Sequence, residues 1–168
     1  MKTYSAFLGL GSNVGERHTF LRTAVRELQN LPLVRVVWTS SVYETDPVGV
    51  VGQSKFLNAA LEIETGIEPL SLLKEVKSIE QRLGRKKTEK WGPREIDIDI
   101  LLYDGLVFED ASLRVPHPEL EKRRFVLVPL REIAPDLVHP ISGMTISELA
   151  HLCNDTGRVV KTSYGLLV

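Results

Sequence analysis

Two aspartates on a predicted strand are the residues best suited to binding a metal ion. Asp97 and Asp99 alternate with three isoleucines in the segment 95–103. Because successive side chains of a strand point to opposite faces, this alternation predicts both carboxylates on one face. Paired carboxylates suit Mg²⁺, which usually takes one or two of them together with phosphate oxygens and water. The same pattern is also typical of a strand with one ordinary solvated face.

A group of basic residues directly precedes this strand. Arg85, Lys87 and Arg94 lie around Trp91 in a very polar segment. Arginine can bind phosphate oxygens through two nitrogens at once, and lysine contributes a compact positive charge. Such a run is usually a solvated loop when it stands alone. Next to paired carboxylates, it predicts a site for a metal-bound polyphosphate such as a nucleoside triphosphate.

Two further segments have a role that the spacing alone leaves open. A second basic group contains His117 and Arg123, and it is compatible with phosphate contacts or with a histidine in a turn between two prolines. The glycine-rich segment 9–13 predicts a tight turn that lines a site, because neither a dinucleotide-binding pattern nor a Walker-type phosphate loop is present. The motifs of zinc hydrolases and serine hydrolases are also absent from the sequence.

Apolar patterns predict the elements that would position these residues. Strands are predicted at 4–10, 34–43, 56–64 and 95–103, and amphipathic helices at 16–29 and 70–83. Loops are predicted at 44–54 and 85–90, a hairpin turn at 104–105 that leads into 106–108, and short helices near 125–131 and 146–153. The order β-α-β-β-α-β predicts an α+β, ferredoxin-like split βαβ sandwich with C-terminal additions. Both amphipathic helices would pack on one face of an antiparallel sheet.

The composition favours one domain over residues 1–168, with about 155–168 as a poorly ordered C-terminal extension. A net charge of -1 and a pI of about 6.4 argue against bulk binding to nucleic acid or to an anionic membrane. No segment approaches the roughly 20 apolar residues that span a bilayer. Cys153 is the only cysteine, so the chain has no intrachain disulfide. We therefore expect a cytoplasmic protein, and a monomer.

The segment 85–102, RKKTEKWGPREIDIDILL, resembles the signature of the 6-hydroxymethyl-7,8-dihydropterin pyrophosphokinase family, commonly W/N-G-P-R-x-x-D-[IL]-D-[IL]. Other matching segments follow in the same order: GLGSN at 9–13, SSVYETDP at 40–47, FLNAA at 56–60, IEQRLGR at 79–85, VPHP at 115–118, 123–125 and 129–135. The resemblance spans nearly the whole chain, although no match covers the residues after 155. It implies that ATP and Mg²⁺ are used to transfer the β,γ-pyrophosphoryl unit to the pterin hydroxymethyl oxygen, with release of AMP, in folate biosynthesis.

The resemblance also implies roles for individual residues. Asp97 and Asp99 match aspartates that bridge two Mg²⁺ ions and face the pterin hydroxyl, whereas Arg85 and Arg94 match arginines that stabilise the transferring phosphates. These four are the implied catalytic residues. The implied ATP-binding residues are Glu80, Lys87, Trp91, Arg94, His117 and Arg123. The implied pterin-binding residues are Thr45, Asp46, Pro47, Val48, Phe56, Asn58 and Phe125.

The chain departs from the family pattern at two positions. Lys87 stands where a second arginine is common, which keeps the charge but loses the two-pronged contact. Phe56 stands where some members have tyrosine, so a hydroxyl is missing. The loops 44–54 and 85–90 are predicted to close over ATP and to exclude water. Two other functions stay compatible with the residues: a metal-dependent nuclease or nucleotidyltransferase that uses the aspartate pair, and a non-catalytic ligand-binding domain.

Overall fold

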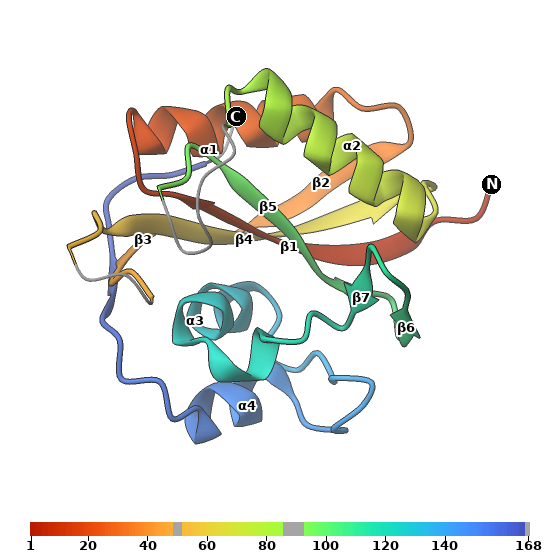
Figure 1. The fold of residues 1–168 in the computed structure, drawn as a ribbon. Helices are drawn as coiled ribbons and strands as arrows, with labels where there is room; N and C mark the ends of the chain where they lie inside the picture. Colours follow the sequence, from red (N-terminus) through yellow and green to blue (C-terminus); the bar gives the residue numbers. More distant parts are fainter. Residues whose placement is uncertain (49–51, 86–92, 167–168) are drawn as a thin grey trace.

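An antiparallel sheet forms the centre of the computed structural model, which describes residues 1–48, 52–85 and 93–166 (Figure 1). Within these residues the sheet has six strands in the order β5-β1-β4-β3-β8, and β2 also pairs with β4. The strands are β1 (Tyr4–Ser12), β2 (Val34–Thr39), β3 (Tyr43–Thr45), β4 (Phe56–Thr65), β5 (Asp97–Tyr103) and β8 (Val159–Lys161). Strand β1 lies between β4 and β5 and pairs antiparallel with both, which confirms the predicted α+β fold with an antiparallel sheet.

Two amphipathic helices, α1 (Arg17–Gln29) and α2 (Pro69–Arg82), cover one face of this sheet (Figure 1). Their apolar side chains are buried against the sheet, among them Leu21 and Leu28 of α1 and Val76 of α2. Burying one such side chain stabilises the fold by roughly 1.5–3 kcal/mol. Proline is tolerated as the first residue of α2 because that position needs no intrahelical N–H donor. The sequence predicts both helices and their packing on one face of the sheet, and the structure confirms this.

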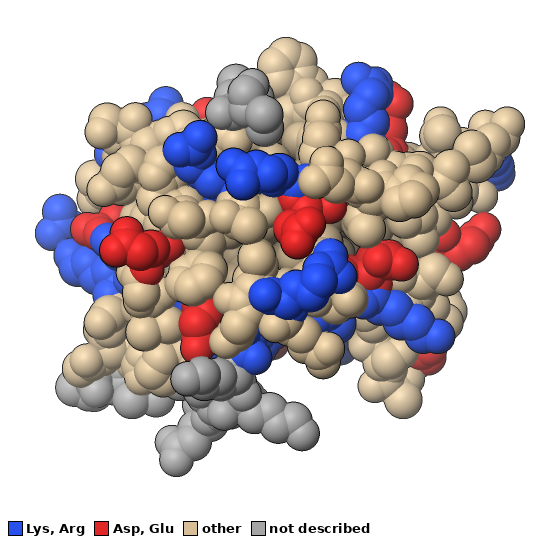
Figure 2. Space-filling model, turned by 90° about the horizontal axis from the view of Figure 1, so that it is seen from above, with Lys and Arg blue, Asp and Glu red and all other residues tan. Residues whose placement is uncertain are grey.

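The outer side of this layer carries charges of both signs. Figure 2 looks down on it and shows basic and acidic side chains next to one another. One such contact joins the two helices, where Arg82 Nε lies 3.5 Å from Glu27 Oε1. Within the described part of the chain, no helix combines the length and the apolar composition needed to cross a membrane.

The C-terminal additions cover the other face of the sheet. They consist of a short 3-10 helix (Leu120–Lys122), α3 (Arg124–Ile133) and α4 (Ile146–Leu152). A second apolar cluster lies between these helices and the sheet, and it includes Leu101 of β5, Leu127 of α3 and Leu149 of α4. The molecule therefore has helices on both faces of the sheet (Figure 1).

The predicted strand 34–43 is wrong as a single element, because β2 ends at Thr39 and β3 begins at Tyr43. Ser40 interrupts it: its Oγ accepts a hydrogen bond from the Ala60 amide (2.8 Å) and donates one to the Ser41 carbonyl (2.7 Å). These side-chain bonds replace part of the regular ladder between the strands. The predicted loop 44–54 consequently starts later, since its first two residues belong to β3.

The turn at Asp104 is confirmed, but the predicted hairpin is wrong. Asp104 has a φ of 45°, and the Leu106 amide donates to the Tyr103 carbonyl (3.0 Å). The Asp104 amide and side chain both bond to Ser5 of β1, so this turn closes onto β1 and not onto a returning strand. The following residues form β6 (Phe108–Glu109), which pairs with β7 (Arg114–Val115) in a separate small sheet.

The prediction of a poorly ordered tail is also wrong for residues 155–166, the part of the tail that the structure describes. Its residues form β8, which adds to β3 at the edge of the main sheet. Beyond β8, Leu166 is 2% exposed and belongs to the core cluster under α1 and α2. An edge strand of only three residues gives a weak sequence signal, because most of its stability comes from the strand beside it.

Candidate functional site

A cavity of about 330 Å³ lies where β1, β4 and β5 face the beginning of α3 and the residues after β3. Two glycines of β1 form its floor. Gly11 pairs with Asp97 on one side and Asn58 on the other, and Gly9 pairs with Asp99. Because glycine has no side chain, the strand between the aspartates and the asparagine leaves open space above the sheet.

The cavity brings together most of the residues that the sequence singled out. Residues far apart in the chain meet there because β1 lies between β4 and β5. The predicted site residues that line it are Thr45, Asp46, Val48, Phe56, Asn58, Arg85, Arg94, Asp97, Asp99, His117, Arg123 and Phe125. Carboxylates and cations occupy the part near β5, and aromatic and amide groups occupy the part near β4.

The two aspartates lie on one face of β5, as predicted, while the isoleucines of the strand are buried on the other. Burial raises the pKa of Asp99, and the nearby Asp97 carboxylate raises it further, against the opposing effects of Lys77, Arg123 and Arg85. Two like charges held this close favour a counter-charge between them. A pair of hard oxygen donors that opens into a cavity fits Mg²⁺, which completes its shell with phosphate and water.

Glu80 lies beneath the cavity and connects its basic side chains to β5. The Glu80 side chain is buried, and its Oε1 contacts Arg85 Nη1 at 2.7 Å and Lys77 Nζ at 3.2 Å. Its Oε2 accepts a hydrogen bond from the Ile98 amide at 2.7 Å. Arg85 Nη1 also lies 3.1 Å from Asp97 Oδ1. One buried carboxylate thus holds a cation beside the aspartate pair and fixes the strand that carries the pair.

Asn13 holds Arg94 at the other side of the cavity. The Asn13 side chain accepts a hydrogen bond from the Arg94 amide (2.7 Å), and the Asn13 amide donates to the Arg94 carbonyl (2.9 Å). Its Nδ2 donates to the Ser54 carbonyl (3.1 Å) and to Gln53 Oε1 (3.2 Å). Asn13 is 3% exposed, so these bonds are shielded from water. They join the end of β1 to two segments that border the cavity.

Amide and aromatic groups form the opposite part of the cavity. Asn58 Nδ2 donates to Thr45 Oγ1 (2.6 Å), which fixes the orientation of the amide. The Arg123 guanidinium lies over the ring of Phe125, 5.7 Å from its centre. Flat rings and an oriented amide suit a planar heterocycle with a polar edge.

The sequence model of the 7,8-dihydro-6-hydroxymethylpterin-pyrophosphokinase (HPPK) family matches residues 7–135. The chain belongs to this family. A Methylorubrum extorquens 2-amino-4-hydroxy-6-hydroxymethyldihydropteridine pyrophosphokinase is 50% identical to it over 143 residues, which cover 85% of this chain and 89% of the relative. The folic acid synthesis protein fol1 of Schizosaccharomyces pombe is 43% identical over 147 residues, which cover 88% of this chain and 20% of that protein.

A solved structure has the same fold. The crystal structure of a Plasmodium falciparum HPPK-DHPS triple mutant superposes with a TM-score of 0.72 at 18% sequence identity. The match covers 89% of this chain and 43% of that chain, so the HPPK-family chain spans less than half of the solved protein. At 18% sequence identity, this similarity supports a shared fold and nothing more.

Two of the predicted site residues that the structure describes do not line the main cavity of this HPPK-family chain. Glu80 lies beneath it, and Pro47 lines a smaller cavity beside it. Lys87 and Trp91 lie outside the described residues, as does most of the predicted loop 85–90. Their implied contacts with ATP therefore stay predictions.

Lys77 lines the cavity, and the sequence reasoning missed it. It lies on α2 three residues before Glu80 and forms an ion pair with it. The available signal was this helical spacing, which places both side chains on one face of α2. Lysines on amphipathic helices are common, however, and only the fold shows that this one reaches the aspartates of β5.

His117 is neutral in the folded protein. Burial, together with the nearby Arg123 charge, lowers its pKa to about 4. Its Nδ1 accepts a hydrogen bond from the Glu119 amide at 3.1 Å. The neutral ring therefore carries its proton on Nε2, which makes Nε2 a donor to a ligand oxygen.

Acidification is expected to destabilise the wild type more than a His117→Asn variant. The pKa of His117 is lower in the folded than in the unfolded chain, so the unfolded chain binds more protons between about pH 6.5 and pH 4. Stability contributed by the neutral ring is present above this window and is lost as the pH falls through it. Urea unfolding at pH 7 and pH 4.5 should show an extra loss of about 1–3 kcal/mol in the wild type. Parallel pH profiles of the two proteins would contradict this prediction.

Proposed function

We propose that this protein transfers the β,γ-pyrophosphoryl unit of ATP to the hydroxymethyl oxygen of 6-hydroxymethyl-7,8-dihydropterin and releases AMP, as a step of folate biosynthesis. The observation that carries the proposal is one cavity in which paired carboxylates and arginines adjoin an aromatic and amide surface. The first part suits a metal-bound polyphosphate, and the second suits a pterin ring. Membership of the HPPK family supports the same reaction.

Asp97 and Asp99 would hold two Mg²⁺ ions together with the ATP phosphates. The geometry that supports this assignment is the placement of both carboxylates on one face of β5 at the cavity wall. When bound, the ions supply positive charge that offsets the charge on the phosphate oxygens during transfer. Asp99 would also accept a hydrogen bond from the hydroxymethyl group and orient its oxygen.

The cations of the cavity would bind and align the polyphosphate. Arg85 contacts Asp97, and Arg94 precedes the aspartates in the chain, while His117 and Arg123 border the cavity from the segment that leads into α3. In the proposed step, a bond forms between the hydroxymethyl oxygen and the β-phosphorus of ATP. The bond from that phosphorus to the oxygen of the α-phosphate breaks, AMP leaves, and the hydroxyl proton is released to solvent. Positioning the two reactants in line accounts for much of the catalysis in such reactions.

The β3–β4 part of the cavity would bind the pterin. Phe56 and Phe125 would contact the ring faces, and Asn58 would pair with the polar edge. Thr45 fixes Asn58 through its hydroxyl, and Asp46 follows it along the cavity wall. The adjoining Pro47 and Val48 complete the proposed pterin site. The predicted closure of the loops 44–54 and 85–90 would keep water away from the phosphates.

Gly11→Ala is expected to weaken pterin binding by tenfold or more, because a Cβ at this position would lie 2.7 Å from Asn58 Oδ1. Such a distance forces the amide or the strand to move. Gly9→Ala is the matched control, since its Cβ would lie 3.5 Å from Leu101 side-chain atoms, an ordinary contact. Titration calorimetry with the pterin should separate the two variants. Equal affinities would show that Asn58 does not set pterin binding.

The proposed enzyme is a cytoplasmic monomer that acts on small molecules, with no nucleic-acid or membrane partner. A net charge of -1 and the mixed charges on the α1–α2 side support the absence of nucleic-acid binding. The rival nuclease activity makes a different prediction, namely cleavage of DNA or RNA in Mg²⁺ without any pterin.

The deciding assay measures AMP formation from ATP and Mg²⁺ with and without 6-hydroxymethyl-7,8-dihydropterin. The proposal expects AMP only in the presence of the pterin, in an amount equal to the pyrophosphorylated product. If folded protein forms no AMP but binds both ligands, the non-catalytic ligand-binding function replaces the proposal.

A further inference from the structure

The C-terminal segment 155–166 runs beside the proposed pterin site. In Figure 1 it rises from α4 along the end of the sheet where β3 lies, and continues toward α1. Its strand β8 pairs with β3 so that Val159 lies opposite Thr45 and Lys161 lies opposite Tyr43. This segment lies after residue 135, where the match to the family model ends.

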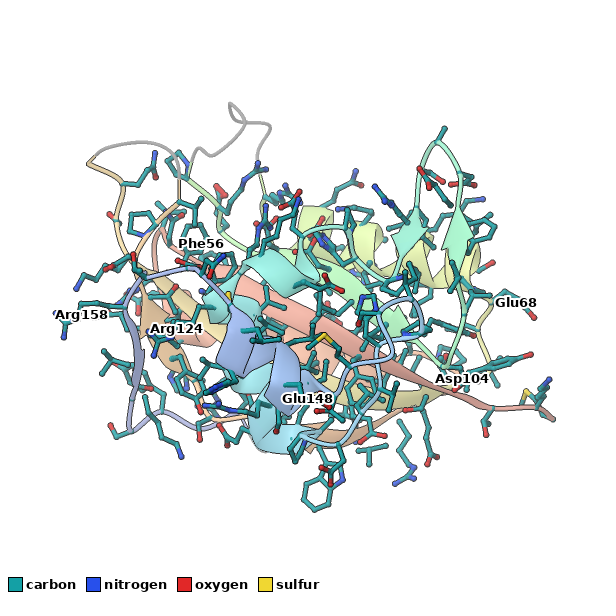
Figure 3. The ribbon with its side chains drawn as sticks, turned by 90° about the horizontal axis from the view of Figure 1, so that it is seen from below. Phe56, Glu68, Asp104, Arg124, Glu148 and Arg158 are labelled. Carbon is teal, nitrogen blue, oxygen red and sulfur yellow. The ribbon has the colours of Figure 1, made fainter. Side chains whose placement is uncertain are left out.

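Two hydrogen bonds join Asp46 of the cavity to the main chain of Arg158. The Asp46 amide donates to the Arg158 carbonyl (3.2 Å), and the Arg158 amide donates to Asp46 Oδ2 (3.0 Å). The second bond involves a carboxylate and is therefore stronger than a neutral one. The Arg158 side chain points away from the body of the molecule at the same end as Phe56 (Figure 3). The main chain at position 158, and not its side chain, thus fixes Asp46.

Asp155 joins the same segment to the start of α3. Its Oδ2 accepts a hydrogen bond from the Arg124 amide (3.0 Å), and its Oδ1 accepts one from the Gly157 amide (2.8 Å). Arg124 is the first residue of α3, whose initial amides have no partner within the helix. The next residue is Phe125, which lines the main cavity. Asp155 therefore positions the aromatic wall of the site through the helix that carries it.

A second cavity of about 220 Å³ lies between this segment and the pterin site. It shares Thr45, Asp46, Val48 and Phe125 with the main cavity. The residues on its far side come from the C-terminal segment, namely Asp155, Gly157, Arg158 and Val159. The same four pterin-site residues thus border a ligand cavity on one side and the C-terminal segment on the other.

The segment is also held at its far end. Thr162 donates from its amide (2.9 Å) and its hydroxyl (2.7 Å) to the Val42 carbonyl. The ring of Tyr164 stacks on His18 of α1 with 4.4 Å between ring centres, and Leu166 is buried. Contacts at both ends leave the intervening residues little freedom to move away from β3.

From these contacts we propose that Asp155 and the main chain of Arg158 are positioning residues for the pterin, because they fix Phe125 and Asp46 on two sides of its site. The inference rests on the proposed function. It states that the C-terminal segment increases the affinity for the pterin and does not affect the affinity for ATP. Within the described residues, no hydrogen bond or ion pair joins Arg85, Asp97 or Asp99 to this segment, so we expect these three side chains of the ATP part to keep their geometry without it.

Arg158→Pro tests the inference, because proline has no amide N–H and therefore cannot donate the hydrogen bond that the Asp46 carboxylate accepts. We expect the pterin dissociation constant to rise about tenfold, which corresponds to about 1.4 kcal/mol. Asp155→Ala, which keeps the main chain intact, should raise it in the same direction. For both variants the dissociation constant of a non-hydrolysable ATP analogue with Mg²⁺ should stay within about twofold.

Two matched variants separate positioning from general damage to the strand. Hydrogen-bonded and non-hydrogen-bonded pairs alternate along an antiparallel ladder, and Arg158 and Thr162 belong to hydrogen-bonded pairs with β3 and its flanking residues. Lys161, opposite Tyr43, therefore belongs to a non-hydrogen-bonded pair, and its amide points away from β3. Lys161→Pro thus places proline in β8 without removing a hydrogen bond to β3. It should leave pterin affinity close to the wild-type value, and so should Arg158→Ala, which retains the amide. Thermal melting of all four variants identifies any global loss of fold.

The outcomes are distinct. Selective loss of pterin affinity in Arg158→Pro and Asp155→Ala supports the inference. Unchanged pterin affinity, or an equal loss for pterin and the ATP analogue, overturns it. The proposed function is tested separately by measuring pterin-dependent AMP formation by the wild type. If the wild type forms AMP and the variants bind the pterin with wild-type affinity, the inference fails and the proposed function stands.

Discussion

Asp99→Ala is expected to lower pterin-dependent AMP formation by about three orders of magnitude while leaving the protein folded. The loss corresponds to about 4 kcal/mol of transition-state stabilisation, a magnitude typical for removal of a metal ligand or a charge-stabilising group. The fold should not suffer, because burial and the nearby Asp97 raise the pKa of Asp99. A raised pKa means that folding disfavours its charged form, so removing the carboxylate at pH 7 relieves this cost.

Two controls make this test specific. Asp99→Asn keeps the size of the side chain but removes the charge, and it should lose activity nearly as completely. Asp136→Ala removes an exposed aspartate far along the chain and should remain fully active. AMP release would be measured at saturating ATP and pterin, and thermal melting would be recorded for each variant. An active Asp99→Ala enzyme would remove this carboxylate from the metal site and from catalysis.

Glu80→Ala is expected to reduce the free energy of unfolding by about 2–4 kcal/mol and also to remove most of the activity. The substitution leaves the Ile98 amide without its buried acceptor and frees Arg85 and Lys77 from their common partner. An unsatisfied buried donor costs roughly 1–3 kcal/mol, and the loss of bonds to a charged group adds to this. Because Arg85 also contacts Asp97, the damage extends to the face of β5 that carries the proposed metal site.

Urea unfolding measures the first effect, with Glu75→Ala on the same helix as the matched control. Glu75 is less buried than Glu80, and its replacement should change stability by less than about 0.5 kcal/mol. Glu80→Gln provides an intermediate case, because one amide oxygen can still accept from Ile98 while the NH₂ group faces the cations. If Glu80→Ala unfolds like the wild type, the buried carboxylate does not hold this part of the site together.

The parts of the site that the sequence predicts are those coded by local periodicity. The alternation around Asp97 and Asp99 places both carboxylates on one face because a strand has a period of two. The spacing of leucines and valines predicts α1 and α2 for the same kind of reason. The resemblance then adds residues such as Asn58 and Phe125, whose side chains carry no chemical pattern of their own. The structure places them in the same cavity as the aspartates.

Other features depend on contacts between distant segments, and no local pattern reports them. Lys77 is an ordinary exposed lysine until the packing of α2 on β5 brings it beside the aspartates. As a charged residue of an amphipathic helix, Glu80 is expected at the surface, yet it is 2% exposed. Its carboxylate is surrounded by three donors, namely Arg85, Lys77 and the Ile98 amide. The strand β8 has too few residues to show a period, and its pairing with β3 crosses more than a hundred residues of sequence.

The position of β8 also bears on how the protein behaves at high concentration. A strand at the edge of a sheet presents free amides and carbonyls to which another chain can add. β8 covers that side of β3, and its own three residues include Lys161, whose charge disfavours further pairing. Proteolytic nicking before Val159, followed by loss of the fragment that carries β8, would uncover β3 and give neighbouring molecules a template for strand addition. A preparation cut at this point should therefore self-associate, even where its helices and its remaining core stay folded.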